Sequence, residues 1–365
     1  MKFSATRDTL LKPLQAVIGV VERRQTMPIL SNVLLVVRDG LLSVTATDLE
    51  VELVAQVEID ADTDGEITVS GRKLLDICRA LPDGVSVTLS VSGDKMAVRA
   101  GKSRFTLATL PAAEFPAIDD IKADQTLEIP HDVLSRLIEK THFSMAQQDV
   151  RYYLNGMLLE TGGNHVRAVA TDGHRLALCQ AEVDGGKLDQ QQLIVPRKGV
   201  IELQRLLGDE GAVNVELGAN HIRVQLDGIR FTSKLIDGRF PEYERVIPKD
   251  SDNELSSDKA LFKSALQRTA ILSNEKYRGI RLVIRDNSVV LQAHNPEQEE
   301  AEEDLEVQYS GDEIEIGFNV NYLLDAIGGV DGDEVTLSVV DSNSSCLIKD
   351  PANADCTFVV MPMRL

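Results

Sequence analysis

The chain repeats itself three times with a period of about 120 residues, which constrains its fold more than any other feature. Ala46-Thr47-Asp48 recurs as Ala170-Thr171-Asp172, 124 positions later, and a weaker copy, Ala293-His294-Asn295, follows after 123 more. A second anchor recurs at spacings of 126 and 127, as Phe105-Thr106, Phe231-Thr232 and Phe358-Val359. Several anchors in one order favour three copies of one folding unit over three unrelated domains.

Each copy contains two amphipathic helices. Apolar residues at helical spacing predict six helices, over 8–18, 72–81, 131–142, 197–207, 258–271 and 319–327. The segments between them alternate apolar and polar residues and are joined by short turns, which is typical of antiparallel strands. We therefore expect an α+β fold of three similar domains, each with antiparallel sheets and two helices on one face. Polar stretches predict domains over 1–120, 121–249 and 250–365.

The net charge of -20, from 38 basic and 58 acidic residues, argues against a conventional nucleic-acid-binding domain. This charge is unevenly distributed, since residues 251–365 hold nine basic and 22 acidic residues. The six predicted helices instead hold 12 basic and seven acidic residues. Lys and Arg are good helix formers, but helix propensity alone would also predict abundant Glu, and the helices contain two. We favour a weakly basic helix face that attracts a phosphate backbone.

Motifs for catalysis or for a metal site are absent from the sequence. The six histidines show neither HxH nor HExxH spacing. Gly101-Lys102-Ser103 resembles the end of a phosphate-binding loop, but Met96 stands where the first glycine is required. The acidic run over 297–304 lacks the calcium-loop pattern and indicates a solvated or partner-facing strip. We expect no catalytic residue, no metal and no cofactor.

The cysteines and the apolar segments indicate the cellular compartment of the protein. Cys78, Cys179, Cys346 and Cys356 are scattered and form no CxxC pair, which favours free buried thiols in a reducing cytoplasm. The amino terminus has no apolar stretch of the signal-peptide type. No apolar run approaches the roughly 18 residues that a membrane-spanning helix needs. We expect a cytoplasmic protein that does not associate with membranes.

Five longer segments resemble a known family. They are Gln148-Asp-Val-Arg-Tyr-Tyr-Leu-Asn-Gly156, Ala170-Thr-Asp-Gly-His-Arg-Leu176, Ile194-Val-Pro-Arg-Lys-Gly199, Asn295-Pro-Glu-Gln-Glu-Glu-Ala-Glu302 and Val360-Met-Pro-Met-Arg-Leu365. Together they resemble the bacterial DNA polymerase III beta subunits, the sliding clamps, and most of all those of Gram-negative proteobacteria. The resemblance extends over the whole chain. It implies a ring-shaped, head-to-tail homodimer with helices lining a central hole around duplex DNA, sheets outside, and no enzymatic activity.

The resemblance also implies a processivity factor that encircles double-stranded DNA without sequence preference. A weakly basic lining inside an acidic ring would permit sliding, because topology rather than counterion release retains the ring. The implied DNA contacts are Arg23, Arg24, Arg72, Gln148, Tyr152, Tyr153 and Lys198. From the residues alone, Tyr152 and Tyr153 are instead expected on a strand, with one in the core and one on the surface.

A hydrophobic pocket between the second and third domains is implied as well, where short linear peptides of partners dock. The implied partners are the DNA polymerase III alpha subunit, the clamp loader, other polymerases and repair proteins. The matching positions are Leu154, Thr171, Gly173, His174, Arg175, Leu176, Pro241, Arg245, Val246, Tyr277, Asn319, Tyr322, Asn343, Ser345, Val359, Val360, Met361, Pro362, Met363, Arg364 and Leu365. Met361 and Met363 suit a pliable apolar floor. Arg175 and Arg364 could hold polar or carboxylate groups. Tyr277 and Asn343 depart from residues common in relatives, which would retune peptide preference.

The implied ring interface pairs an edge of the first domain with an edge of the third. On the first domain it comprises Lys73, Arg104, Phe105 and Leu107, and on the third Ile271, Leu272, Glu297, Glu299, Glu302 and Glu303. A basic edge that meets an acidic strip favours head-to-tail contact. Two alternatives stay open: a metal- or nucleotide-dependent enzyme, and a repeat scaffold without a role on nucleic acid.

Overall fold

The computed structural model describes residues 1–21, 27–118, 122–184, 186–248 and 253–364. These residues form six α-helices, each within three residues of its predicted bounds: α1 (Arg7–Val17), α2 (Gly71–Ala80), α3 (His131–Glu139), α4 (Arg197–Leu206), α5 (Lys259–Thr269) and α6 (Val320–Gly329). None of the described helices is long and apolar enough to cross a membrane.

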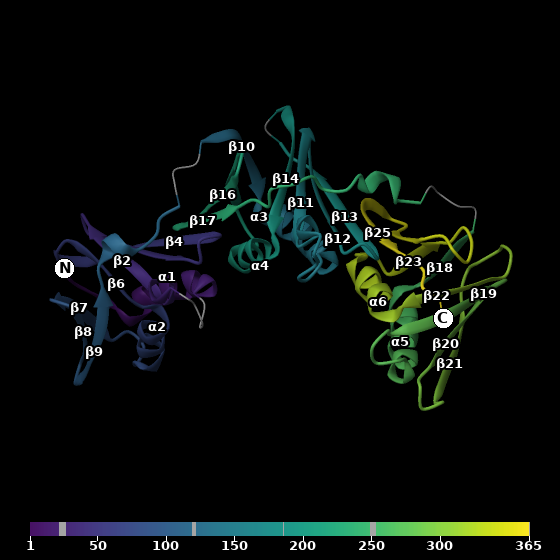
Figure 1. The fold of residues 1–365 in the computed structure, drawn as a ribbon, viewed down its shortest axis with the longest axis horizontal. Helices are drawn as coiled ribbons and strands as arrows, with labels where there is room; N and C mark the ends of the chain where they lie inside the picture. The colour runs from purple at the N-terminus through teal and green to yellow at the C-terminus, as the bar shows by residue number, and fades with distance from the viewer. Residues whose placement is uncertain (22–26, 119–121, 185, 249–252, 365) are drawn as a thin grey trace. The chain divides into compact units, whose positions relative to one another are not determined.

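Each copy has one strand before its first helix and three after its second, with five strands between the helices in the first copy and four in the other two (Figure 1). The first copy holds β1 (Lys2–Thr6), β2 (Asn32–Arg38), β3 (Leu41–Thr47), β4 (Val51–Glu58), β5 (Asp60–Thr63), β6 (Gly65–Ser70), β7 (Ser86–Ser92), β8 (Lys95–Ala100) and β9 (Ser103–Leu110). The second holds β10 (Ala123–Pro130), β11 (Gly156–Gly163), β12 (His165–Thr171), β13 (Arg175–Glu182), β14 (Leu188–Pro196), β15 (Ala212–Gly218), β16 (His221–Leu226) and β17 (Ile229–Lys234). The third holds β18 (Glu254–Asp258), β19 (Gly279–Arg285), β20 (Ser288–His294), β21 (Glu300–Glu306), β22 (Ile314–Asn319), β23 (Glu334–Ser338), β24 (Cys346–Asp350) and β25 (Asn353–Val360). The threefold repeat is confirmed.

Each helix begins directly after a strand, and three of the helices begin at a side-chain cap. The side chains of Thr6, Asp258 and Asn319 each accept a backbone N–H from the first turn of the following helix. Such caps satisfy donors that the first turn leaves unpaired. Each helix then buries one apolar stripe, such as Leu134, Leu137 and Ile138 in α3. The sequence therefore specifies both where these helices begin and which face they bury.

All described strand pairs are antiparallel, and the chain forms two compact units. The first unit, residues 1–132 and 198–235, holds a 13-stranded sheet in the order β10-β15-β16-β17-β4-β3-β2-β6-β9-β8-β7-β1-β5. The second, residues 133–197 and 236–365, holds an eight-stranded sheet, β14-β11-β12-β13-β25-β24-β23-β18, and a four-stranded sheet, β21-β20-β19-β22. Within each unit two successive copies share a sheet, because β17 pairs with β4 and β13 pairs with β25.

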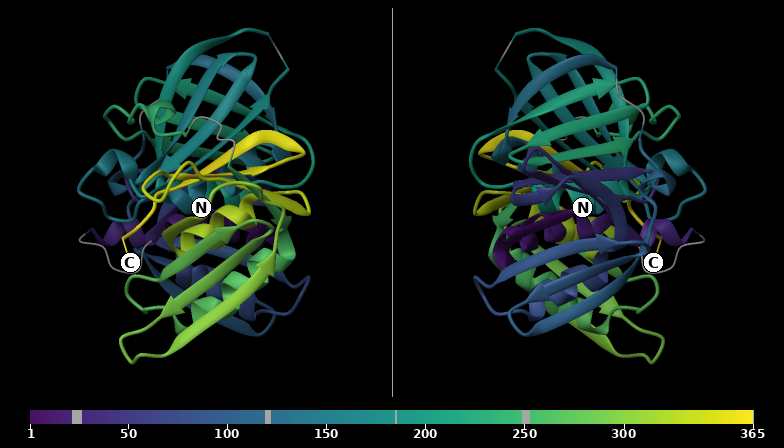
Figure 2. Two further views of the ribbon diagram at one scale, coloured as in Figure 1. Left: turned by 90° about the vertical axis from the view of Figure 1, so that its right-hand side faces the viewer. Right: turned by 90° about the vertical axis from the view of Figure 1, so that its left-hand side faces the viewer.

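Helices cover one face of the sheets, as predicted. In the first unit α1 packs against α2, and in the second α5 packs against α6. The left panel of Figure 2 shows the light-green strands β19–β22 in front of α5 and α6, and the right panel shows the blue strands β7–β9 in front of α1 and α2. The α+β class, with antiparallel sheets and two helices per copy, is confirmed. The bounds 1–120, 121–249 and 250–365 remain a prediction, because the compact units follow the shared sheets.

The expectation of four free thiols is wrong for two cysteines. Cys179 on β13 and Cys356 on β25 form a disulfide, because the register of these strands sets the two residues directly opposite each other. They are 177 residues apart in sequence, so spacing gives no hint of the pairing. Cys78 and Cys346 are free and buried. Burial raises the pKa of the Cys78 thiol to about 11 and that of Cys346 to about 12.

Candidate functional site

An apolar cavity of about 170 Å³ opens in the second unit where β12, β13 and β25 meet the segment after β17. Nine residues assigned to the peptide pocket by resemblance line it: Leu154, Thr171, Gly173, Arg175, Leu176, Pro241, Val246, Val359 and Met361. Three further residues complete the lining: Arg151, Tyr153 and Tyr243. The fold thus brings together positions spread over 211 residues of sequence.

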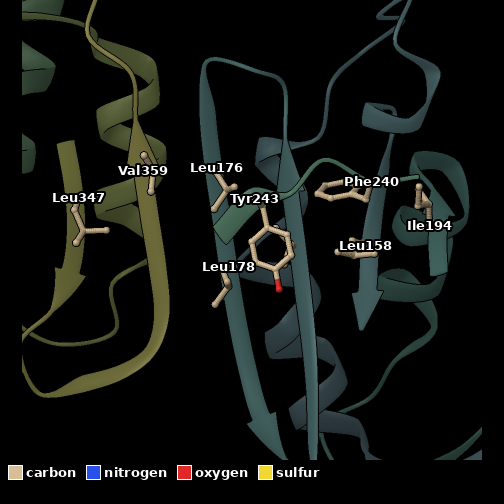
Figure 3. Close-up of a cluster of buried hydrophobic side chains, with 9 residues drawn as sticks. Leu158, Leu176, Leu178, Ile194, Phe240, Tyr243, Leu347 and Val359 are labelled. Carbon is tan, nitrogen blue, oxygen red and sulfur yellow. The ribbon is translucent and has the colours of Figure 1, made fainter. Parts of the chain in front are cut away.

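A buried hydrophobic cluster forms the floor of this cavity (Figure 3). Leu176 on β13 and Val359 on β25 are direct partners in the strand ladder, and both belong to the cluster and to the cavity lining. Figure 3 shows the Tyr243 ring between Leu176 and Leu178 of β13 on one side and Leu158 of β11 on the other, with its hydroxyl pointing away from Leu176. Tyr153 packs against the same cluster. A close-packed floor keeps the cavity wall rigid.

The turn between β12 and β13 depends on a glycine. Gly173 has a positive φ of 88°, which disfavours residues with a Cβ. A Cβ at this position would also lie 2.9 Å from the Arg151 guanidinium. The Thr171 hydroxyl donates to the Arg175 carbonyl at 2.6 Å, and the Asp172 carboxylate accepts the Arg175 backbone N–H at 3.1 Å. These contacts set one rim of the cavity.

The Arg175 guanidinium is engaged by the protein itself. Its Nε donates to Asp172 at 3.1 Å, its Nη1 to Asp325 at 2.6 Å and its Nη2 to the Phe143 carbonyl at 2.5 Å. It also stacks over the Tyr322 ring at 4.4 Å from the centroid. The predicted capture of peptide carboxylates by Arg175 stays a prediction, and the geometry favours a role as a rigid wall.

Arg151 was not predicted as a cavity residue, although it lies inside the segment Gln148–Gly156 used for the resemblance. Its Nε and Nη2 donate to the Asp149 carboxylate at 3.0 and 2.8 Å. These hydrogen bonds hold the pKa of Asp149 down at about 2. Arg151 also donates to the Asp172 carbonyl, so it links the loop to the β12–β13 turn. Tyr243 was not predicted either, and its position two residues after Pro241 is the one signal that could have indicated it.

The other predicted pocket residues that the structure describes lie outside the cavity lining: His174, Arg245, Tyr277, Asn319, Tyr322, Asn343, Ser345, Val360, Pro362, Met363 and Arg364. Leu365 lies outside the described residues. Asn319 caps α6, and Tyr322 in the same helix supports Arg175. Tyr277 is 56% exposed. For these residues, contact with a bound peptide stays a prediction.

The two tyrosines assigned to DNA lie in a single 3-10 turn, η5 (Tyr152–Leu154), so the expected strand is wrong. The Asn155 side chain causes this, because it accepts the Asp149 backbone N–H and donates to the Asp149 carbonyl, both at 2.9 Å, and so closes the loop. Tyr152 is 57% exposed, whereas Tyr153 is half-buried. Gln148 is exposed with a φ of 56°. Both Gln148 and Tyr152 are therefore accessible from solvent, and their contacts with DNA stay predictions.

Two other predicted DNA contacts, Arg72 and Lys198, belong to the first unit. Arg72 in α2 donates to the Val21 carbonyl at 2.8 Å. Lys198 in α4 pairs with Asp48 at 2.5 Å. Arg23 and Arg24 lie outside the described residues.

Several cations of the predicted helix segments are ion-paired with acidic partners. The pairs are Arg136–Asp331, Lys140–Asp331, Lys198–Asp48, Arg205–Glu202 and Arg268–Glu303. A neutralised cation contributes less to attraction of a phosphate backbone. The helices are therefore less basic toward DNA than their composition suggests, which fits a surface that holds DNA lightly.

Comparison with known proteins finds one family along nearly the whole chain. Three sequence models of the DNA polymerase III beta subunit match it: the N-terminal domain over residues 1–119, the central domain over 128–242 and the C-terminal domain over 244–364. The chain belongs to the DNA polymerase III beta subunit family of sliding clamps. Sliding clamps are processivity factors of DNA replication and not catalytic enzymes, so the predicted clamp function is confirmed, and neither the enzyme nor the scaffold alternative is favoured.

Relatives match this clamp from end to end. The beta sliding clamp of Pseudomonas putida is 55% identical over 367 residues, and that of Escherichia coli K12 is 52% identical, each covering all of both chains. A crystal structure of the beta subunit from Pseudomonas aeruginosa has a TM-score of 0.97 at 54% identity over all of both chains. A sliding clamp of that species bound to griselimycin matches equally well.

The edges assigned to the clamp interface are open strand edges in each unit. Among the described strands, β9 pairs with β8 along its length and with β6 only at Thr109 and Leu110. β21 pairs with β20 and with no second described strand. Such edges offer unpaired N–H and C=O groups to another chain.

The side chains at these edges differ in exposure. Lys73 and Arg104 are exposed, and Phe105 and Leu107 are half-buried. In the third copy Ile271, on η7 (Ala270–Leu272), is 75% exposed and Leu272 is half-buried.

Hydrogen bonds order the acidic strip. Arg268 holds Glu303 through hydrogen bonds of 2.6 and 2.9 Å, and these lower the pKa of Glu303. Glu302 accepts from Gln292, and Glu299 from Asn295. Glu297 is exposed.

Proposed function

We propose that this sliding clamp encircles duplex DNA as a head-to-tail homodimeric ring in the cytoplasm and tethers its partners through the apolar cavity. Those partners are the DNA polymerase III alpha subunit, the clamp loader, and other polymerases and repair proteins. The observation that carries the tethering role is the cavity, whose lining holds nine of the residues expected for a peptide pocket. We also propose the domain bounds 1–120, 121–249 and 250–365.

Charge and hydrogen-bonding geometry support the ring. The β9 edge carries Arg104, and Lys73 on α2 of the same unit is exposed, whereas β21 carries Glu302 and Glu303. Joining β9 of one protomer to β21 of its partner would satisfy both open edges and pair opposite charges. A second identical contact on the far side would close the ring, since two head-to-tail contacts complete a two-protomer circle.

The DNA role can be tested by topology. We expect the protein, loaded by its clamp loader onto nicked circular DNA, to stay bound through gel filtration and to be lost once the circle is linearised. Blocking the free ends with a tightly bound protein should restore retention, because only sliding off the end releases a closed ring. Stable retention on linear DNA with open ends would contradict the proposal.

The tethering role can be tested with a fluorescein-labelled linear peptide from the alpha subunit. Removal of the last five residues deletes Met361, which lines the cavity, and also Met363, whose N–H donates to the Gly317 carbonyl at 2.8 Å. We expect peptide affinity, measured by fluorescence anisotropy, to fall by about tenfold or more, the scale of one buried side-chain contact. Unchanged affinity in a folded variant would contradict the peptide role.

A further inference from the structure

Tyr243 connects the cavity to two residues that line a second, separate hollow. Its side chain is 4% exposed, and its ring belongs to both the hydrophobic cluster and the cavity lining. Its hydroxyl accepts a hydrogen bond from Arg167 Nη1 at 2.8 Å and donates to Glu160 at 3.2 Å. Arg167 and Glu160 line a polar hollow of about 780 Å³ on the same sheet.

Arg167 and Glu160 are themselves held firmly. They are direct partners in the β11–β12 ladder, and Arg167 Nη1 lies 3.3 Å from Glu160 Oε1. Gln180 accepts from Arg167 Nη2 at 3.0 Å, and Gln192 donates to Glu160 at 2.6 Å. The side chains of Arg167 and Glu160 are 28% and 17% exposed. A charged pair in this setting gives the Tyr243 hydroxyl a fixed anchor.

The fold does not require this pair, because the other copies do without it. At the 124-residue offset the equivalent positions are Val36 and Ser43, direct partners in β2–β3 that line a comparable hollow of about 750 Å³. In the third copy, 123 residues further on, they are Val283 and Val290, again direct partners. The Arg–Glu pair occurs in the one copy that carries Tyr243 and the cavity. Its role is therefore local to the cavity.

We propose that Arg167 and Glu160 are positioning residues that hold the Tyr243 ring as a fixed wall of the peptide cavity and so set peptide affinity. The inference rests on the proposed peptide binding. Tyr243 stands at the start of a short 3-10 turn, η6 (Tyr243–Arg245), outside the strand ladders. Without its hydroxyl anchor this turn would sample other positions, and ordering it on binding would cost affinity.

The test compares Tyr243→Phe, Arg167→Gln and the double variant in the full-length clamp, with the labelled alpha-subunit peptide as probe. Each single variant should bind the peptide about three- to tenfold more weakly, the range expected for one hydrogen bond. The double variant should be no weaker than the worse single one, because both changes break one network. Arg167→Lys should restore part of the affinity, since it keeps a cationic donor.

A matched control separates positioning from general stability. Arg223 pairs with Glu216 at 3.6 Å on β16 and β15, with its side chain 15% exposed, in the unit that contributes no cavity residue. Arg223→Gln should lower the free energy of unfolding about as much as Arg167→Gln, yet leave peptide affinity unchanged. A matching affinity loss in the control would overturn the inference.

The outcomes also separate this inference from the proposed function. If removal of the last five residues weakens binding but Tyr243→Phe and Arg167→Gln bind like wild type, the positioning role is wrong and the peptide role stands. Additive losses in the double variant would likewise overturn it. If no variant binds more weakly, the peptide role itself fails. Tyr243→Phe removes only the hydroxyl and keeps the ring, so its peptide affinity can still be measured if Arg167→Gln fails to fold.

Discussion

Replacing Ile271 and Leu272 with Ala should separate the two protomers of the ring. Ile271 is 75% exposed on η7, beside the open strand β21, and serves no core of its own chain. Because it stands beside an open strand edge, this exposed apolar side chain is available to a partner that adds a strand there. The perturbation therefore removes contact area between protomers and little from within one.

The magnitude follows from the area that each side chain has left to bury. Ile→Ala and Leu→Ala each remove about three methylene equivalents, worth about 0.8 kcal/mol apiece when fully buried. Scaled by its 75% exposure, Ile271 alone contributes about 1.8 kcal/mol to one interface, and Leu272, which its own chain mostly covers, contributes less. A two-protomer ring has two such interfaces, so the loss is about 4–5 kcal/mol for each ring. The dissociation constant should then rise by about 10³-fold or more.

Sedimentation velocity over a range of concentrations measures this directly. Wild type should sediment as a dimer and the double variant as a 40 kDa monomer. The matched control is Leu261→Ala in α5, a residue 60% exposed but outside the predicted interface, which should stay dimeric. Circular dichroism of the double variant should match wild type. If the double variant is a dimer at every concentration, the predicted interface is wrong. If Leu261→Ala is a monomer, the loss of the dimer is not specific to the interface residues.

Three further predictions concern the ion pairs and the disulfide. Asp48→Asn removes the carboxylate charge that pairs with Lys198 and should steepen the salt dependence of duplex binding, measured by anisotropy, by up to about one unit of log–log slope; an unchanged slope would count against Lys198 as a DNA contact. Burial raises the pKa of Asp331, but hydrogen bonds from Lys140 and Arg136 outweigh it and lower the pKa overall, so its ion pairs add stability above pH ~4 that is lost as pH falls. Asp331→Asn should lower the free energy of unfolding at neutral pH by only about 1 kcal/mol, because Asp331 is half-exposed. The free energy of unfolding of this variant, measured with denaturant, should also fall less than that of wild type as the pH is lowered; an equal fall would contradict this. Reductant should lower the free energy of unfolding by up to about 5 kcal/mol, because the disulfide spans 177 residues; no change would mean that the bond is absent in solution.

Local features of this fold were predictable from sequence. The helix bounds follow from apolar stripes and from caps such as Asp258, which act within a few residues of chain. The antiparallel sheets follow from alternation and short turns. The repeat fixes their order, since three copies of one pattern must fold alike.

Features that depend on distant pairing were not predictable. The Tyr152 segment has strand-like composition, but the side chain of Asn155 closes it into a turn. The Cys179–Cys356 bond and the Tyr243 wall arise only once β13 has paired with β25 and the segment after β17 has packed on β13. A residue's partners in such a ladder are set by register, which local spacing does not encode.

The strand pairs that join neighbouring copies bear on any attempt to produce one copy alone. Cutting the chain at a sequence boundary would part β4 from β17, or β13 from β25, and leave long backbone edges open to water. Such edges recruit any strand within reach, so an excised fragment should aggregate even if its own helices and strands form. One sequence copy is thus smaller than a piece suited to expression. Because each compact unit combines two separate stretches of the chain, no single cut would separate the units either.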